Sequence, residues 1–401
     1  MKTFDLTESF VDKPFSDCDL LVISGEHSGD QHAAELVKNL LQSQPSLNIA
    51  SLGGPKLKNC VAHFLGDITP LSVVGFVEVL RHYWTFKSLF KKLLKWIQDN
   101  RPANILLVDY PGFNLRLAEA LYKKNLSKKA GGSISIHYYI APQVWAWRSK
   151  RRFTMAKFLD SLAVILPFEV ASFADTSLPT TFVGHPFTKK FNQSLTPRLT
   201  WNPDSPIGIF PGSRDAAIRR IFPILLRGLR WWRCCQPQNK NRAFTIIYPN
   251  EFICKLYKKI LQEFPDLEPS FNYVANSGKQ VSLSAVLTSS GTLSLECALS
   301  GIPGTIVYKT HPLTYWLGKR VVKISYLGLA NIILGKILYP ELLQEEAFPS
   351  NIAKRLDQNL NIVKNPESWN KQVKNLRKRL SGTPSMTPSQ WLEKLINYKK
   401  P

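Results

Sequence analysis

The sequence predicts an α/β protein with two domains of similar design, each a parallel sheet flanked by helices. Short apolar runs that end at glycine- or proline-containing turns alternate with stretches of helical periodicity, an order typical of parallel sheets. The alternation stops at residues 191–206, which are rich in proline and polar side chains, and then begins again. At 401 residues, with 44% hydrophobic and 20% charged residues, the chain is long enough for more than one complete core.

The same pattern gives the domain boundaries and the main strands. We expect an N-terminal extension at 1–19, a first α/β domain at 20–190, the linker at 191–206, a second α/β domain at 207–346, and C-terminal helices at 347–401 that pack back on the first domain. The expected strands of the first domain are 20–23, 48–52, 104–108, 134–140, 162–166 and 181–183. Those of the second are 207–210, 244–248, 284–287 and 305–307.

The charge balance indicates an anionic partner. The net charge is +23, from 52 Lys and Arg against 29 Asp and Glu, so nucleic acid, an anionic membrane surface and anionic substrates are all candidates. Residues 1–19 lack the pattern of a signal peptide, and no apolar run reaches the roughly 18 uncharged residues of a membrane span. The six cysteines show no CxxC pair and no metal-ligand spacing. We expect reduced thiols in a cytosolic protein, and neither a metal nor a cofactor.

A glycine-rich turn, Gly25–Asp30, follows the first expected strand and opens a helix. Ser28 with Gln31 three residues later is a capping-box pattern. Such a turn lies at the ligand-binding edge of open α/β sheets, although it is also common as a plain connection. There is no G-x-G-x-x-G sequence, so a dinucleotide site is not supported.

Residues 73–97 combine helical periodicity with a wide apolar face, and most of their lysines lie on the other sides. The pattern fits either a helix packed on a sheet or an interfacial membrane helix. Because the bulky side chains extend beyond one packing face, we favour contact with an anionic membrane. The residues expected to make it are Phe76, Tyr83, Trp84, Phe86, Phe90 and Trp96.

Asp109 stands at the carboxyl end of the apolar strand 104–108, which we expect to be buried on both faces. A carboxylate at that edge can take a proton from an attacking hydroxyl. The alternative is that Asp109 caps the helix that begins near Leu115. The sequence does not decide between these two roles.

A basic stretch follows, since residues 120–159 contain nine Lys and Arg and no acidic residue. Such a run usually marks a solvated face. Trp145 and Trp147 lie inside it, which favours a site for anionic lipid or phosphate. His185, before a proline, is more typical of a structural turn than of a catalyst.

Two strand ends in the second half have the features of phosphate sites. Gly212, Ser213 and Arg214 follow the strand 207–210, and an arginine fork suits a diphosphate. Gly291 and Thr292 begin a helix after the strand 284–287, where free N–H groups attract anions. Glu296, one turn further, is placed to accept hydrogen bonds from ribose hydroxyls. Taken alone, this second stretch also fits a buried connection with a solvated glutamate.

Several short motifs carry a family resemblance when they are taken together and in order. They are Gly25–Asp30, Val74–Leu80, Asp109–Asn114, Pro142–Arg148, Leu166–Glu169, Gly184–Pro186, Pro211–Arg214, Ser290–Glu296 and Glu341–Glu345. In this order they resemble the lipid-A-disaccharide synthase family. The resemblance implies the GT-B architecture, in which two Rossmann-like domains face each other across a cleft. It also implies an inverting transfer from UDP-2,3-diacylglucosamine to 2,3-diacylglucosamine 1-phosphate that gives a β-1,6 disaccharide 1-phosphate and UDP.

The resemblance also implies roles for individual residues. Asp109 would be the base for the acceptor 6-hydroxyl. Arg214, with the backbone of Gly212 and Ser213, would stabilise the leaving diphosphate, which Gly291 and Thr292 would help to hold, and Glu296 would bind the ribose. The first-domain side of the cleft would be lined by Glu26, Ser28 and Asp30, and the second by Asn331, Gln344 and Glu345. The family resemblance further implies a peripheral protein on the cytoplasmic face of the bacterial inner membrane, often as a homodimer.

The sequence departs from the family pattern at Gly112, where an acidic residue is usual, at Ala217 and at Ala330. Two rival functions are considered. A UDP-sugar epimerase of the same fold would bind UDP but would have no use for an interfacial helix. A basic nucleic-acid-binding protein would explain the charge, but no recognised nucleic-acid motif is present.

Overall fold

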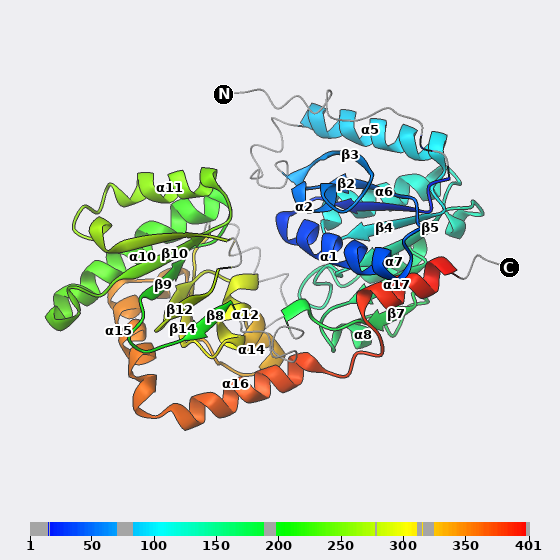
Figure 1. Cartoon of the computed structure of the whole chain (residues 1–401). Helices are drawn as coiled ribbons and strands as arrows, with labels where there is room; N and C mark the ends of the chain where they lie inside the picture. The colour runs from blue at the N-terminus through cyan, green and yellow to red at the C-terminus, as the bar shows by residue number, and fades with distance from the viewer. Residues whose placement is uncertain are drawn as a thin grey trace. The chain divides into compact units, whose positions relative to one another are not determined.

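The computed structural model describes residues 15, 17–69, 83–187, 198–276, 279–310, 315 and 325–397. The chain divides into two compact units, one formed by Met1–Pro186 with Gly382–Pro401 and the other by Phe187–Ser381. Each unit is built around one large parallel sheet with helices on both faces (Figure 1). The predicted α/β class with parallel sheets in two domains is confirmed.

The first unit holds a seven-stranded sheet in the order β3-β2-β1-β4-β5-β6-β7, in which every pair is parallel. Its strands are β1 (Leu20–Ser24), β2 (Ile49–Gly53), β3 (His63–Asp67), β4 (Asn104–Val108), β5 (Ser135–Tyr139), β6 (Ser161–Val164) and β7 (Thr180–Phe182). Every residue of β1 and β4 is buried, which explains why these strands are almost continuously apolar. The strand order reverses between β1 and β4.

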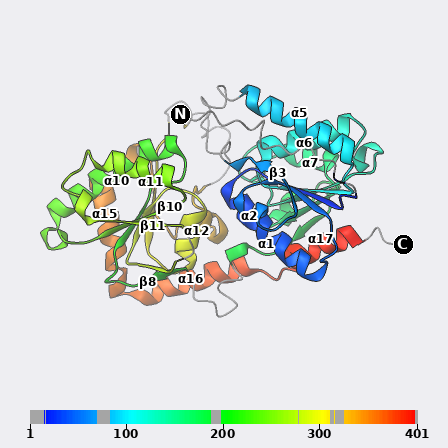
Figure 2. The ribbon, with the colours of Figure 1, turned by 45° about the horizontal axis from the view of Figure 1, so that its top comes forward.

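Two hydrophobic clusters hold the helices of this unit on its sheet. The helices are α1 (His27–Ser43), α2 (Pro55–Lys58), α5 (Tyr83–Asn100), α6 (Pro111–Lys123), α7 (Arg151–Phe158), α8 (Glu169–Ser172) and α17 (Pro388–Asn397). Helices α5, α6 and α7 share one cluster with the sheet, and α1, α2 and α17 share the other. The last helix, α17, lies beside α1 in both ribbon views although the two are far apart in sequence (Figures 1 and 2).

The second unit holds a six-stranded sheet in the order β11-β10-β9-β13-β14-β15, again with every pair parallel. Its strands are β9 (Ile207–Phe210), β10 (Phe244–Tyr248), β11 (Phe271–Ala275), β13 (Val286–Thr288), β14 (Gly304–Tyr308) and β15 (Glu341–Leu343). A separate two-stranded sheet pairs β8 (Leu199–Trp201) with β12 (Val281–Leu283). In the large sheet the order reverses between β9 and β13.

The helices of the second unit are α10 (Asp215–Cys235), α11 (Glu251–Leu261), α12 (Thr292–Leu299), α14 (Leu329–Leu334), α15 (Pro349–Leu360) and α16 (Pro366–Ser381). Helices α10, α11 and α15 share the main hydrophobic cluster, while α12, α14 and α16 contact one another. Two arginines of α16 stabilise the ends of its neighbours. Arg377 donates to the carbonyl of Leu299 at 2.7 Å, and Arg379 to that of Leu334 at 2.7 Å, where helix carbonyls lack partners.

The structure revises three sequence-based boundaries. Residues 199–201, expected in the linker, form β8, because Leu199 is buried and the Trp201 indole donates to the carbonyl of Ser284. Residues 341–343, where no strand was expected, form β15. Of the C-terminal helices, α15 and α16 belong to the second unit, and only residues from Gly382 onward belong to the first.

Candidate active site

In the first unit, the loops after β1 and β4 leave the sheet side by side at the point where the strand order reverses. Ser24 pairs with Val108, so Gly25 and Asp109 are the first residues beyond a shared edge. The carboxyl edge at such a reversal is where open α/β sheets bind ligands. Asp109 therefore lies at the carboxyl edge of the sheet, where the sequence analysis expected it and where one of its two candidate roles was that of a general base.

The backbone at Asp109 has an uncommon conformation. Asp109 has a φ of 49° and Tyr110 a φ of 47°, two successive non-glycine residues in the left-handed region. Each such residue costs on the order of 1 kcal/mol, so the surrounding contacts must hold the pair in place. The N-cap residue of α6 is Tyr110, so Asp109 precedes the cap position that was its alternative role.

Three hydrogen bonds hold the Asp109 backbone. The hydroxyl of Tyr138 donates to the Asp109 carbonyl at 2.6 Å, and the amide of Asn114 donates to the same oxygen at 2.7 Å. The Asp109 N–H donates to the carbonyl of Tyr139 at 2.9 Å. Burial and the nearby charge of Asp109 keep the pKa of Tyr138 well above its usual value, so its hydroxyl remains a donor. The sequence analysis gave Tyr138 and Asn114 no role. Tyr138 reaches the Asp109 carbonyl from the neighbouring strand β5, and Asn114 reaches it because the backbone turns after Asp109.

Glu26 and Tyr110 complete this edge. Glu26 is the half-buried N-cap residue of α1, and Ser28, exposed in the first turn, is not the cap that its pattern predicted. Burial and then the charge of Glu26 raise the pKa of Tyr110 to about 12. The Tyr110 ring packs on Gly25, where an added Cβ would lie 2.1 Å from the ring. The edge thus carries two carboxylates and two protonated tyrosines.

Replacing Gly25 with Ala is expected to displace the Tyr110 ring and, with it, Asp109. Overlap of this size typically costs about 1–3 kcal/mol of folding free energy. The matched control is Gly112→Ala, since an added Cβ at Gly112 meets nothing within 4 Å and alanine is the better helix former. Urea denaturation and transferase assays of both variants check this: equal stability and activity would contradict the expected contact.

Two residues of the predicted first-unit set lie in the interior instead. Asp30 is 2% exposed, and its carboxylate accepts from the backbone N–H groups of Gly54, Lys56 and Leu57 at 2.8–3.2 Å. It therefore holds the start of α2, and we correct the expectation that it lines the cleft. The cause is that residues 54–57, more than twenty positions away, fold back onto it.

Trp96, expected at a membrane, is 3% exposed and belongs to the hydrophobic core. Phe86 and Phe90 are half-buried against the same core, so much of the wide apolar face of α5 packs on the sheet. Trp84 is 72% exposed, with the Lys87 ammonium 5.0 Å from the centre of its ring. The Tyr83 side chain and the whole of Phe76 lie outside the described part of the structure.

In the second unit, the two predicted phosphate loops meet at the reversal between β9 and β13. Phe210 pairs with Thr288, and a Cβ added to Gly212 would lie 3.2 Å from the Ser289 hydroxyl. Gly212 has a φ of 120°, which favours glycine, and its carbonyl accepts from the Tyr257 hydroxyl at 2.5 Å. Ser213 and Arg214 are exposed just before α10 begins.

The second of these loops ends at the start of α12. Gly291 is the N-cap residue, an added Cβ there would meet nothing within 4 Å, and Thr292 is exposed as the first helical residue. The first-turn N–H groups of a helix have no partner within it. The first-turn N–H groups of α12 and the loop of Gly212 and Arg214 lie at one edge of the sheet. Both can donate hydrogen bonds to the same anionic group.

Glu296 lies one turn into α12, 8% exposed, and has a partner that the sequence did not reveal. Arg198 donates to its two carboxylate oxygens at 2.8 and 3.1 Å, and also contacts the side-chain oxygen of Asn276. Arg198 lies in the middle of the expected linker, 98 residues from Glu296, so no local pattern links the two. The pair restrains the carboxylate that we expected to bind ribose.

The other predicted donor-site residues differ in exposure. Asn331 is fully buried: its side chain accepts from the N–H groups of Leu338 and Tyr339 and donates to Glu341. Gln344 is 6% exposed with a φ of 50°, and it exchanges two hydrogen bonds with the backbone of Thr310.

Glu345, by contrast, is exposed. Asn331 and Gln344 therefore shape the loops of this edge, and of these three predicted residues only Glu345 is fully accessible.

Glu169 is a buried acid that anchors the loop of residues 142–148. Its carboxylate accepts from the Trp145 indole at 3.2 Å and from the Leu166 N–H at 3.0 Å. Burial raises the pKa of Glu169 from its ordinary value near 4.5 to about 7, against the opposing effect of these donors. The motif Leu166–Glu169 was part of the resemblance, but its residues were given no role.

The raised pKa of Glu169 predicts a pH-dependent stability. Between about pH 4.5 and pH 7 the folded protein binds this proton more tightly than the unfolded chain, so the free energy of unfolding falls as pH rises. The amide of Glu169→Gln cannot ionise, so its free energy of unfolding should not show this fall. The difference in free energy of unfolding between Glu169→Gln and wild type should therefore grow by about 3 kcal/mol, in favour of the variant, as pH rises through this range. Urea denaturation at pH 5 and pH 8 tests this. The exposed Glu119→Gln variant is the control, and a constant difference between wild type and Glu169→Gln would contradict it.

Within the described residues, no group of three or more His, Cys, Asp or Glu side chains could hold a metal ion. The cysteines are all free. His185 is 5% exposed, and burial lowers its pKa to about 3, so it stays neutral.

No helix in the described part of the chain is both long and apolar enough to cross a membrane.

Comparisons with known proteins agree with this geometry. A sequence model of the lipid-A-disaccharide synthetase family matches residues 20–389. The chain is 34% identical over 376 residues to lipid-A-disaccharide synthase of Trichlorobacter lovleyi, covering 90% of this chain and 93% of that protein. It is 33% identical over 380 residues to the enzyme of Geobacter metallireducens, covering 90% and 92%.

Solved structures show the same fold at low sequence identity. The glycosyltransferase of kitacinnamycin has a TM-score of 0.58 at 11% identity, covering 97% of this chain and all of that one. A putative UDP-N-acetylglucosamine 2-epimerase from Listeria monocytogenes has a TM-score of 0.57 at 10% identity, covering 95% of each chain. These likenesses support the predicted GT-B fold, and the sequence matches go further: the chain belongs to the lipid-A-disaccharide synthetase family of glycosyltransferases.

Proposed function

We propose that this hexosyltransferase divides its reaction between the two sheet edges described above. The second unit holds UDP-2,3-diacylglucosamine by its diphosphate, and the first unit presents the 6-hydroxyl of 2,3-diacylglucosamine 1-phosphate. The observation that carries this division is the position of Asp109, at a strand-order reversal with its backbone held by three hydrogen bonds. The two loops that meet at Gly212 and Ser289 support the assignment of the diphosphate.

The reaction is a single displacement. Asp109 takes the proton of the 6-hydroxyl as that oxygen attacks the anomeric carbon of the donor sugar. The bond from this carbon to the diphosphate oxygen breaks, and UDP leaves with the bonding electron pair. Attack from the face opposite to the leaving group inverts an α-linked donor to a β-1,6 linkage.

The negative charge that grows on the leaving diphosphate needs stabilisation. Arg214 can supply a permanently charged fork of donors, and the loop of Gly212 and the start of α12 add backbone N–H groups. In this proposal Glu296, oriented by Arg198, accepts from the ribose hydroxyls through the lone pairs that the arginine leaves open.

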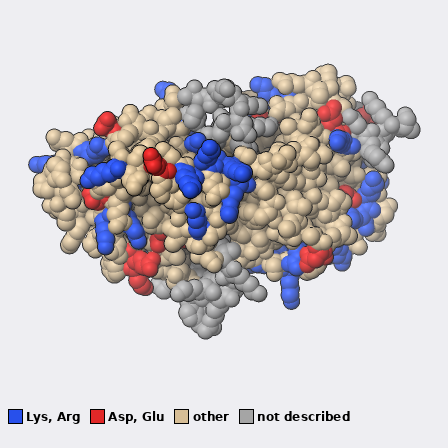
Figure 3. Space-filling model, turned by 90° about the horizontal axis from the view of Figure 1, so that it is seen from below, with Lys and Arg blue, Asp and Glu red and all other residues tan. Residues whose placement is uncertain are grey.

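We further propose that the protein works on the cytoplasmic surface of the bacterial inner membrane, because both substrates carry acyl chains. The net charge of +23 favours an anionic surface. The face shown in Figure 3 carries more lysine and arginine than acidic side chains, which supports this attraction. Of the aromatic residues first proposed for contact, the exposed Trp84 is retained and the buried Trp96 is not. A homodimer, as in other family members, remains a prediction.

UDP release by the purified chain in detergent micelles tests the function. Release that needs both the donor and the acceptor 1-phosphate is the expected result. Release from the donor alone would indicate hydrolysis or the rival epimerase chemistry. No release with either combination would contradict transferase activity on these substrates.

A further inference from the structure

The loop between β5 and α7 carries an exposed tryptophan beside two arginines. Trp147 is 41% exposed. The guanidinium carbon of Arg148 lies 4.6 Å from the centre of a Trp147 ring, and that of Arg151 lies 5.4 Å from it. Two cations thus contact the same indole, and each guanidinium still has N–H donors that can bind another group.

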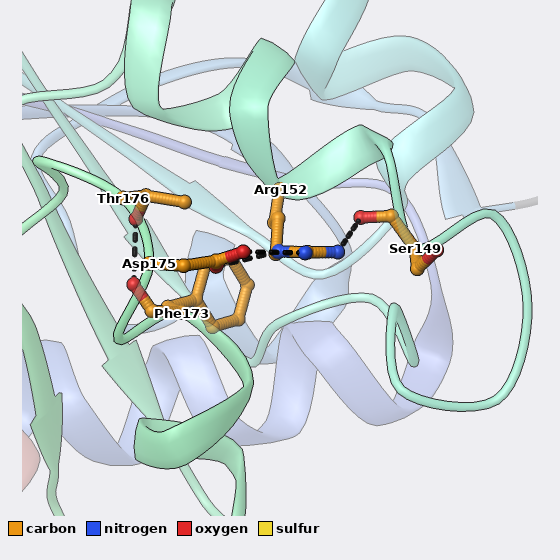
Figure 4. A network of polar contacts seen from close by, with 5 residues as sticks. All are labelled: Ser149, Arg152, Phe173, Asp175 and Thr176. Atoms are coloured by element: carbon orange, nitrogen blue, oxygen red, sulfur yellow. Dashed lines mark hydrogen bonds and ion pairs between the residues drawn. The ribbon is translucent and has the colours of Figure 1, made fainter.

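The next arginine, Arg152 in the first turn of α7, is neutralised by a carboxylate. Arg152 forms two parallel bonds with the carboxylate of Asp175, at 2.7 and 2.5 Å, and donates to the carbonyl of Ser149 at 2.8 Å (Figure 4). This network ties the first turn of α7 to the segment after α8 (Figure 4). The loop that holds Arg148 and Arg151 is thereby fixed in place.

Arg148 and Arg151 have no such partner among the described residues, where neither forms an ion pair with a carboxylate. The absence of any acidic residue from 120 to 159 accounts for this locally. Burial and the charge of Arg148 both lower the pKa of Arg151, which shows that the two cations repel each other. A dianion placed between them would remove that repulsion.

The pair belongs to the same sheet edge as Asp109. The charge of Arg151 reaches Tyr138, where it opposes the rise in pKa that burial causes. The Tyr138 hydroxyl in turn donates to the carbonyl of Asp109 at 2.6 Å. Val108 at the end of β4 pairs with Tyr139 at the end of β5, so Asp109 and the loop that carries Arg148 leave neighbouring strands at the same edge of the sheet.

We propose that Arg148 and Arg151, on the face of Trp147, bind the phosphate of the acylated acceptor sugar. The inference rests on the proposed function and names the group that this edge recognises. A phosphate monoester carries about −1.5 to −2 charges at neutral pH and three acceptor oxygens, and a guanidinium fork can donate to two such oxygens at once. The exposed indole supplies apolar surface beside the cations, which suits an amphipathic ligand.

The test compares kcat/KM for the acceptor 1-phosphate and for the same acylated sugar without its phosphate. In the Arg148→Gln/Arg151→Gln variant, the preference for the phosphorylated acceptor should fall by about 10- to 100-fold, mainly through KM. Activity with the unphosphorylated acceptor should hardly change. Arg148→Lys/Arg151→Lys should retain part of the preference. Lys157→Gln, which removes a charge from the far end of α7, should retain all of it.

An unchanged preference in the double glutamine variant would overturn the proposal. Flotation with phosphatidylglycerol vesicles tests whether the arginines bind lipid headgroups and not the acceptor phosphate. If the double variant lost vesicle binding but kept the acceptor preference, the arginines would be assigned to membrane headgroups. If wild type shows no transfer, the proposed function fails by itself. In that case the affinity of wild type and of the double glutamine variant for the phosphorylated acceptor is measured in micelles. Binding that is at least about tenfold weaker in the variant would support the inference, and equal binding would overturn it.

Discussion

Replacing Asp109 with Asn is expected to lower kcat by about 10²- to 10⁴-fold, the range typical of a lost general base. The amide has nearly the same shape, and the three backbone hydrogen bonds described above are unaffected by the change of side chain. The fold and the binding of both substrates should therefore persist. Initial rates at saturating donor and acceptor measure the change, and KM for each substrate should stay within a few-fold of wild type.

The control for Asp109→Asn is Glu119→Gln, which removes an exposed acid of α6 that pairs with Lys123. A surface ion pair of this kind contributes little to folding stability, so the activity of Glu119→Gln should match that of wild type. If Asp109→Asn retained full kcat, or lost activity only through a raised KM, Asp109 would serve substrate binding and another group would be the base.

Replacing Arg198 with Ala is expected to destabilise the second unit by about 3–5 kcal/mol. The cost arises because the carboxylate of Glu296, 8% exposed, would be left in a buried site without its cation. Arg198→Ala/Glu296→Ala should recover much of the loss, since no buried charge then remains. Because the chain has two compact units, hydrogen exchange at β13 and α12 measures the stability of the second unit more directly than a single melting temperature does.

A matched pair in the same unit provides the control. Arg219 also donates to both oxygens of a carboxylate, that of Asp215, but on the exposed surface of α10. Removing this exposed ion pair in Arg219→Ala should lower the free energy of unfolding by less than about 1 kcal/mol. If Arg198→Ala cost no more than Arg219→Ala, the Glu296 pair would have no special role in stability. In a separate UDP titration, weaker binding by Arg198→Ala is expected because Glu296 is no longer oriented.

The sequence located the strand ends that carry the candidate site, because fully buried parallel strands are nearly continuous apolar runs with glycine-containing ends. Asp109, Gly212 and Gly291 were found in this way, and the structure places each at a strand-order reversal. The strands absent from the expected list are only partly buried, namely β3, β8, β11, β12 and β15. In β15 only Leu342 is buried, while Glu341 accepts from the N–H groups of Leu327 and Gly328, an arrangement that no periodicity encodes.

The errors at single residues share one physical cause, which is contact between distant segments. Asp30 looked like a ligand residue until residues 54–57 were seen to surround it. Trp96 belongs to a helix whose apolar face fits a sheet or a membrane equally well, and only packing distinguishes the two. Arg198 and Tyr138 gave no signal, because each acts on a residue from another element of its unit.

The linkage of the disaccharide product tests the central claim most directly. The purified chain, supplied with UDP-2,3-diacylglucosamine and 2,3-diacylglucosamine 1-phosphate, should give a product whose NMR couplings and long-range correlations show a β-anomeric carbon joined to oxygen 6. This result would support inversion with the 6-hydroxyl as nucleophile. An α linkage, a bond to another hydroxyl, or an epimerised sugar without disaccharide would contradict the account.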